Sequence, residues 1–261
     1  MVKESQTEYL MEGKEEQSGL EKISCPDGYN LTEVGVIPED WVFCTLSEIA
    51  EITSSKRIFE SDYVQDGVPF FRGQEISQLL ARKALDKRYY ISEAKFFQIK
   101  KQFGVPKKGD ILITAVGTLG NSYLVDTDSE FYFKDGNLIW LRNLKKVSSR
   151  YLAKQLEWLK PKILDSAIGS SQKALTIVVL KSFNIPFPKL KEQTAIANTL
   201  FDVDTLITSL EKLITKKRAI KTATMQQLLT GKKRLPGFGE GKGYKQTELG
   251  EIPEDWEVVK L

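Results

Sequence analysis

Histidine is absent from the 261-residue sequence, and cysteine occurs only twice, at Cys25 and Cys44. The lack of histidine excludes Ser-His-Asp and Cys-His catalytic arrangements and histidine-ligated metal sites. Two isolated cysteines provide neither a zinc-binding spacing nor a disulfide framework. Any catalysis would have to depend on carboxylates, lysine or tyrosine. The composition therefore favours a binding protein over an enzyme.

Long apolar runs are also absent. No stretch approaches the roughly 18 consecutive apolar residues of a transmembrane helix. The first residues, MVKESQTEYLMEGKEEQ, are polar and acidic and lack the apolar centre of a signal peptide. These features predict a reduced, cytoplasmic protein with no membrane partner.

Charge is small in total but unevenly distributed. The net charge is +3, whereas residues 1–28 carry three lysines and seven acids, for a net charge of −4. Residues 70–108 carry ten basic and three acidic side chains, and residues 189–234 carry ten and four. Two basic blocks on a nearly neutral chain are typical of local contact with a polyanion, although a lysine-rich solvated surface would give the same pattern.

Residues 29–188 show mixed α and β patterns, after a polar extension over residues 1–28. A strand is predicted in GVPFFRG, and a helix ending at Gly104 is predicted in SEAKFFQIKKQFG. A hairpin is predicted from 111–116 and 122–125. A second pair of strands is predicted around the Asp135-Gly136 turn of EFYFKDGNLIWLR.

Two further patterns complete the first domain. Helical spacing of leucines in SRYLAKQLEWLKPKIL predicts a helix that Pro161 kinks or ends. The segment FNIPFPKL, with prolines at positions 186 and 188, predicts an extended exit from the domain.

Residues 191–230 change character and predict one long helix. Apolar residues recur at alternating steps of four and three, which is the spacing of a coiled-coil seam. Gly231 and Pro236 lie just beyond the pattern and are typical of a helix end. About 40 residues would form a helix about 60 Å long. Packing on its own domain is one interpretation, and pairing with a second long helix is the favoured one; the seam residues are Ile196, Leu200, Val203, Ile207, Leu210 and Ile214.

Short motifs for nucleotide or metal chemistry are not convincing. The GFGEGKG segment has glycines at the wrong spacing for a phosphate-binding loop and follows Pro236 instead of a strand. The tetrapeptide NIPF differs from the Asn-Pro-Pro-aromatic motif of amino-methyltransferases at Ile185. Glu93 and Lys95 match the end of a metal-nuclease motif, which leaves a nuclease as a third hypothesis.

Several segments suit nucleic-acid contact without proving it. If FFRGQEI is extended, Arg72 and Gln74 lie on the same side, and arginine reads guanine while glutamine reads adenine. The glycine turn GTLGN and the polar loop GSSQKAL can approach a phosphate or a base. Each segment also has an ordinary structural interpretation as a strand end, a hairpin turn or a surface loop.

Together, several stretches resemble the specificity subunit of type I restriction–modification systems. They are TEVGVIPEDW, VPFFRGQEI, KKGDILITAVGTLGN, SSQKALTIVVLKSFNIPFPKLKEQTAIANTL and LLTGKKRLPGF, in family order over residues 29–261. The Pro-x-x-x-Glu-Gln junction from Pro188 to Gln193 is the most specific part. The implied fold is a mixed α/β target recognition domain over 29–188, then a long spacer and dimerisation helix over 189–234 that pairs as an antiparallel coiled coil.

The resemblance implies a non-catalytic subunit that reads one half of a split target in double-stranded DNA. Such a subunit recruits modification subunits, which bind S-adenosylmethionine and methylate adenine. It also recruits restriction subunits, which use ATP and magnesium to translocate and cut. No cofactor is expected in this chain itself. A stand-alone DNA-binding or regulatory protein with the same domain is the alternative.

The family pattern has two recognition domains and two helices, whereas this sequence has one of each. Residues 29–46 and 244–261 share ten identities in 18 positions, so residues 235–261 are interpreted as the start of a second repeat. The chain is therefore interpreted as a half subunit, and its unpaired helix predicts a homodimer with a twofold axis. A symmetric dimer would read an interrupted palindrome.

The residues that contact DNA cannot be carried over from the family, because recognition domains differ in target. They are chosen here by chemistry. The candidate base readers are Arg72, Gln74, Asn121 and Gln172. The candidate phosphate contacts are Lys56, Arg57, Arg82, Lys83, Lys107, Lys108 and Lys173.

Overall fold

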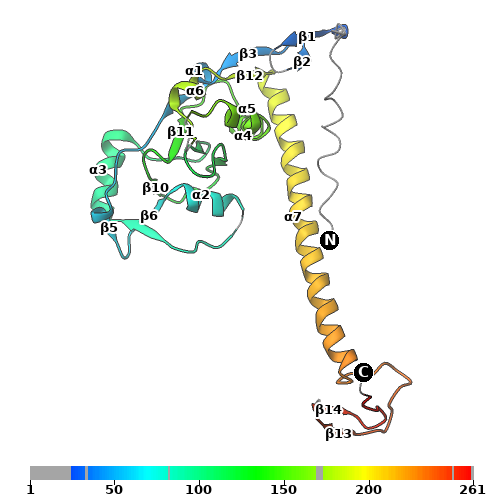
Figure 1. Ribbon diagram of the computed structural model, residues 1–261. Coiled ribbons are helices and arrows are strands. Elements are labelled where there is room, and N and C mark those ends of the chain that lie inside the picture. Colours follow the sequence, from blue (N-terminus) through cyan, green and yellow to red (C-terminus); the bar gives the residue numbers. More distant parts are fainter. Residues whose placement is uncertain (1–24, 33–34, 82, 169–172, 249, 260–261) are drawn as a thin grey trace.

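The computed structural model describes residues 25–32, 35–81, 83–168, 173–248 and 250–259. A mixed α/β domain occupies the first part of this range, and a long helix leads away from it to a second small hairpin (Figure 1). The predicted α/β class and the long helix are confirmed. Among the described residues, no helix is both long and apolar enough to cross a membrane.

The domain is closed by the pairing of a strand near its start with its last strand. The first described elements are a hairpin of β1 (Tyr29–Thr32) and β2 (Gly35–Pro38), followed by β3 (Val42–Thr45). Strand β3 pairs antiparallel with β12 (Asn184–Phe187), which is the predicted extended exit. Because this sheet has only two strands, Pro186 removes no hydrogen bond from a third one.

The central sheet is antiparallel, with the order β4 (Glu51–Thr53), β11 (Leu138–Arg142), β8 (Ile111–Thr114) and β9 (Ser122–Leu124). All four residues of β8 are buried, which explains its unbroken apolar run. The predicted β8–β9 hairpin is confirmed, although β8 ends at Thr114, two residues earlier than predicted. The main core includes α1 (Leu46–Ile49), α4 (Ser149–Trp158), α5 (Lys160–Asp165) and α6 (Ile177–Lys181).

A second sheet has the order β10 (Tyr132–Phe133), β6 (Val68–Phe71), β7 (Tyr89–Ile91) and β5 (Tyr63–Val64). The short helix η1 (Glu60–Asp62) precedes β5, and α2 (Gly73–Leu80) follows β6. Helix α3 (Glu93–Phe103) follows β7 and ends at Gly104, as predicted.

The two predicted strands on either side of Asp135-Gly136 are confirmed, but they do not pair with each other. Strand β10 pairs parallel with β6, while β11 pairs with β4 and β8 in the other sheet. The turn therefore carries the chain from one sheet to the next. Its two ends are held separately, since the Lys134 amide donates to the Phe71 carbonyl and the Ala115 amide donates to the Asn137 carbonyl. Pairing partners distant in sequence thus outweigh the local turn signal.

Pro161 interrupts the helical segment after the central sheet, as expected. Helix α4 ends at Trp158, Leu159 caps it, and α5 begins with Pro161 in its first turn. This position needs no backbone donor, so proline is tolerated there.

Helix α7 (Leu190–Leu229) contains 40 residues and is about 60 Å long. It packs on α4 near its start and then runs away from the domain (Figure 1). At its far end Gly231 adopts a φ of 71°, and the hairpin of β13 (Tyr244–Thr247) and β14 (Gly250–Pro253) follows. The repeated sequence is therefore a repeated hairpin.

Candidate nucleic-acid interface

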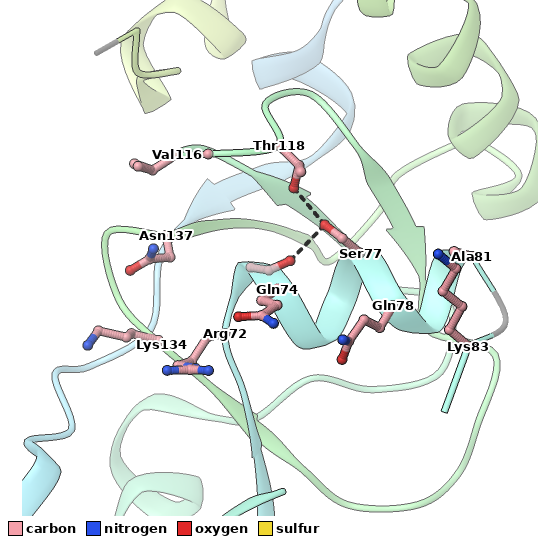
Figure 2. A pocket seen from close by; sticks show the side chains of 12 residues that line it. Arg72, Gln74, Ser77, Gln78, Ala81, Lys83, Val116, Thr118, Lys134 and Asn137 are labelled. Carbon is pink, nitrogen blue, oxygen red and sulfur yellow. Dashed lines mark hydrogen bonds between the residues drawn. The ribbon is translucent and has the colours of Figure 1, made fainter. Parts of the chain in front are cut away.

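A cavity of about 560 Å³ opens where α2 meets the turns after β8 and β10. Its wall contains three amide side chains and three cations (Figure 2). They are Gln74, Gln78, Asn137, Arg72, Lys83 and Lys134. Hydrogen bonds of Ser77 join the wall together, because its hydroxyl lies 2.6 Å from that of Thr118 and donates to the Gly73 carbonyl at 2.8 Å.

Arg72 lies at the N-cap of α2, held by Glu75. Its Nε and Nη2 donate to the two Glu75 carboxylate oxygens at 3.1 and 2.8 Å, and its guanidinium lies 4.1 Å from the centre of the Tyr89 ring. Burial of Glu75 alone would raise the pKa of its carboxyl group, but the hydrogen bonds from Arg72 outweigh burial and lower that pKa. The cation is therefore fixed in place before any ligand arrives.

The fixed arginine still has donors to offer. Arginine has five N–H donors in a planar fork. Glu75 accepts from only two of them, the Nε hydrogen and one Nη2 hydrogen. Among the described residues no acceptor is bound to Nη1. The side of the guanidinium formed by Nη1 and the second Nη2 hydrogen can donate to two acceptors on one base, such as O6 and N7 of guanine.

Gln78 contributes an acceptor without a partner. Its Nε2 donates to Asp86, while its Oε1 is buried and has no hydrogen-bond partner within the described part of the chain. A buried acceptor left unpaired costs free energy. Because the Oε1 atom is not exposed to solvent, the Gln78 amide would have to turn before it could accept a hydrogen bond from an exocyclic amino group of adenine or cytosine.

The local structure around Arg72 differs from the one assumed from the sequence. The segment FFRGQEI is extended only through β6, because Gly73 begins α2. Glu75 reaches back to the Arg72 amide at 2.9 Å, which is the capping-box contact that starts the helix. Arg72 and Gln74 nevertheless line the same cavity.

Three of the predicted DNA contacts, Arg72, Gln74 and Lys83, are brought together in this cavity. Sequence reasoning missed Gln78, Lys134 and Asn137. Gln78 follows Gln74 by four residues, a spacing that places both on one side of a helix. A helix signal at Arg72-x-x-Glu75 would have revealed it.

The other predicted base readers lie elsewhere. Asn121 accepts a hydrogen bond from Lys160 Nζ at 2.5 Å, so it faces α5 and does not line the cavity. Gln172 falls outside the described residues, as does Arg82.

The remaining predicted phosphate contacts are exposed side chains of the domain. Lys56 lies over the Phe103 ring at 4.6 Å, and Arg57 pairs with Asp135 at 2.9 Å while 69% of its side chain stays exposed. Lys108 pairs with Asp128 at 3.0 Å, and Lys107 and Lys173 are also exposed. Such surface pairs contribute little to stability and can be exchanged for phosphate.

The nuclease motif has no supporting geometry. Glu93 and Lys95 lie in the first turn of α3, and Lys95 Nζ is occupied by Asp62 at 3.3 Å. Among the described residues, no cluster of three or more acidic or cysteine side chains is placed to hold a metal ion.

The family model of the type I restriction modification DNA specificity domain matches residues 38–222. This chain belongs to that family. The match covers the cavity, both sheets and most of α7, so the resemblance inferred from short motifs is confirmed. Assignment to the specificity component, and not to a catalytic component, is confirmed with it.

Curated relatives of this specificity-family chain carry corresponding names. The chain is 32% identical over 242 residues to the putative type I restriction enzyme MjaX specificity subunit of Methanocaldococcus jannaschii, covering 90% of the chain and 55% of that relative. It is 25% identical over 228 residues to the MjaVIII specificity subunit of the same organism, covering 86% and 49%. The chain thus spans about half the length of these relatives.

Solved structures of related chains share the fold. A chain of a type I R-M system superposes with a TM-score of 0.58 at 21% identity, covering 73% of this specificity-family chain and 45% of that chain. The HsdS subunit from Thermoanaerobacter tengcongensis gives a TM-score of 0.53 at 20% identity, covering 77% and 47%.

Proposed function

We propose that this chain is the DNA-recognition component of a type I restriction–modification complex and that residues 29–188 read one half of a bipartite target. The cavity beside α2 is the observation that supports this most directly. It combines a fixed arginine edge, three amides and two lysines, which are the groups that read base edges and hold phosphates. Family membership supplies the biological setting.

In this proposal the chain performs no chemistry. Modification subunits with S-adenosylmethionine and restriction subunits with ATP and magnesium assemble on it, and the complex acts on DNA in the cytoplasm. The relatives' names as specificity subunits support this division of labour.

The helix α7 is proposed to pair antiparallel with the α7 of a second copy. Leu200, Val203, Ile207, Leu210 and Ile214 are each 42–50% exposed and form one stripe, whereas Ile196 is partly covered near α4. Leu206 and Leu213 widen the stripe, with 60% and 49% exposure. A stripe of exposed leucine, isoleucine and valine side chains is stabilised when a second helix covers it.

The fixed start of α7 would let the helix set the spacing between two half-sites. Lys154 of α4 forms ion pairs with Asp204 of α7 and Glu157, and Arg150 lies 5.2 Å from the centre of the Phe201 ring. The helix direction is therefore tied to the domain that carries the cavity. Lengthening α7 between Ile207 and Ile214 should change the spacer of the target and leave the half-site sequences unchanged.

The function is tested by reconstitution. The chain is mixed with modification subunits and S-adenosylmethionine, and methylated adenines are mapped on a DNA library. We expect methylation at an interrupted palindrome only when both components are present. Binding to DNA without capture of modification subunits would favour the stand-alone DNA-binding alternative.

The pairing of α7 is tested separately by sedimentation equilibrium at micromolar concentration. We expect a dimer that Ile207→Asp converts to a monomer, because the substitution would bury a carboxylate in the apolar stripe. Ser209→Asp, on the other side of the helix, is the matched control and should remain dimeric. A monomeric unmodified chain would refute the pairing.

A further inference from the structure

The far end of α7 forms a seat for the hairpin β13–β14. Gly231 and Pro253 are buried against each other, and a Cβ atom added to Gly231 would lie 2.3 Å from Pro253 Cγ. The positive φ of Gly231 and this close approach both require glycine. The Tyr244 hydroxyl donates to the Gly231 carbonyl at 3.2 Å.

A charged contact completes the seat. Arg234 donates from Nη1 and Nη2 to the two Asp255 oxygens at 2.7 and 2.9 Å, and its guanidinium lies 5.7 Å from the centre of the Trp256 ring. Bidentate pairs of this kind are geometrically specific. The hairpin therefore contacts the helix end through four side chains: Tyr244, Pro253, Asp255 and Trp256.

The first hairpin of the chain carries the same four side chains in the same framework. Tyr29, Pro38, Asp40 and Trp41 stand at the equivalent positions. Tyr29 is opposite Pro38 in β1–β2, as Tyr244 is opposite Pro253 in β13–β14.

The turn that follows each hairpin is also equivalent. The Glu39 amide donates to the Gly28 carbonyl at 2.9 Å, and the Glu254 amide donates to the Gly243 carbonyl at 3.0 Å. Whatever the second hairpin offers to the seat, the first can therefore offer too.

Among the described residues of its own chain, the first hairpin has no such seat. Asp40 forms no ion pair with any described residue, and Leu31 and Val36 are 59% and 40% exposed. The hairpin lies beside the start of α7, at the opposite end of the helix from Arg234 (Figure 1). It is therefore separated from the chain's own seat by about the 60 Å length of α7.

We propose that the seat formed by Gly231 and Arg234 binds the β1–β2 hairpin of a second copy of this chain, and that β13–β14 is its competitor within the same chain. The inference rests on the proposed antiparallel pairing of α7, because that arrangement brings the end of one helix beside the start of the other. Each seat then has two alternative occupants with the same contact residues. Exchange of one hairpin for the other therefore changes how tightly the two copies are held together at the ends of the paired helices.

Cross-linking distinguishes the two occupants. Cys25 and Cys44 are replaced by alanine in the full chain, and exposed positions beside the contacts receive cysteine. The pair Glu39→Cys and Lys233→Cys detects the hairpin of a second copy bound at the end of α7. The pair Glu254→Cys and Lys233→Cys detects the chain's own hairpin bound there. A short bis-maleimide gives a covalent dimer in the first case and an internal link in the second.

Two matched substitutions should change the yield of covalent dimer from the Glu39→Cys, Lys233→Cys variant in opposite directions. Asp255→Ala weakens the internal competitor and should raise the covalent dimer several-fold. Asp40→Ala removes the corresponding carboxylate from the incoming hairpin and should lower the covalent dimer by a similar factor. Both carboxylates are at the surface, so neither change is expected to prevent folding.

Sedimentation of the same samples separates this inference from the proposed pairing. A dimer in solution that gives no covalent dimer, even with Asp255→Ala, would overturn the shared seat and leave the pairing of α7 standing. Equal responses to Asp40→Ala and Asp255→Ala would overturn the competition. A monomer would overturn both the pairing and the seat for a second copy.

Discussion

Gln193 joins the long helix to the recognition domain and provides the sharpest test of the fold. Its side chain is fully buried. Its Oε1 accepts from the Ser148 amide at 2.8 Å, and its Nε2 donates to the carbonyls of Pro188 at 2.8 Å and Lys146 at 3.3 Å. One amide therefore holds the start of α7, the start of α4 and the loop between β11 and α4.

Replacing Gln193 with leucine puts an apolar side chain of similar volume in its place and removes all three hydrogen bonds. A buried backbone group that loses its partner costs about 1–3 kcal/mol. Counting only the two backbone groups bound at 2.8 Å, those of Ser148 and Pro188, the expected loss is about 2–6 kcal/mol in the free energy of unfolding. For a urea m-value of about 2 kcal/mol/M, the midpoint should fall by at least about 1 M.

Urea unfolding followed by circular dichroism measures this loss. Gln193→Glu is the informative second variant, because it keeps an acceptor for the Ser148 amide but turns an oxygen toward the Pro188 carbonyl. It should be at least as destabilising as leucine. Glu192→Gln changes the exposed neighbour and should leave the midpoint unchanged. A midpoint for Gln193→Leu within about 0.3 M of the unmodified chain would refute the reasoning, given that m-value.

Three further predictions follow from the cavity and the seat. Gln78→Ala should reduce discrimination at one base position by about 1–3 kcal/mol, measured by competition binding with single-base variants of the target. Lys134→Ala should weaken all sequences alike and lower the salt slope of binding by about one, measured by titrations at several salt concentrations. Asp255 has its pKa lowered from 3.8 to about 2 by the Arg234 hydrogen bonds, so its contribution to hairpin docking is present above pH 3.8 and is lost as the pH falls toward 2. Amide NMR of Gly231 should follow this loss, and Asp255→Asn should abolish that step.

Elements with strong local signals could be predicted from the sequence. The a/d spacing and Gly231 marked α7 nearly to the residue, since a helix 40 residues long repeats its pattern many times. Gly104 and Pro161 marked helix boundaries because their backbone restrictions act locally.

Pairing over long distances could not be predicted in the same way. The turn at Asp135-Gly136 has the usual hairpin residues, yet β10 and β11 belong to different sheets. What decides their partners is the burial of Phe133 and Trp140 against residues distant in sequence, in the cluster that also contains Ile76 and Leu112. No local pattern carries that information.

The candidate site was predictable only in part, for a similar reason. The chemistry of Arg72, Gln74 and Lys83 indicates DNA contact and the three do share a cavity, but Lys134 and Asn137 come from the turn between the two four-stranded sheets. Their place beside α2 depends on the parallel pairing of β10 with β6, which the sequence did not indicate.

By itself the sequence determined the family, the long helix and the repeat, because each depends on residue order or on local periodicity. Only the tertiary structure decided that the repeat is a hairpin seated on Gly231 and Arg234. It also decided that Arg72 is held by Glu75 and that the Gln78 Oε1 atom is buried without a partner among the described residues. Those outcomes depend on burial and on which charged groups meet in space, and neither quantity is a property of any single segment of the chain.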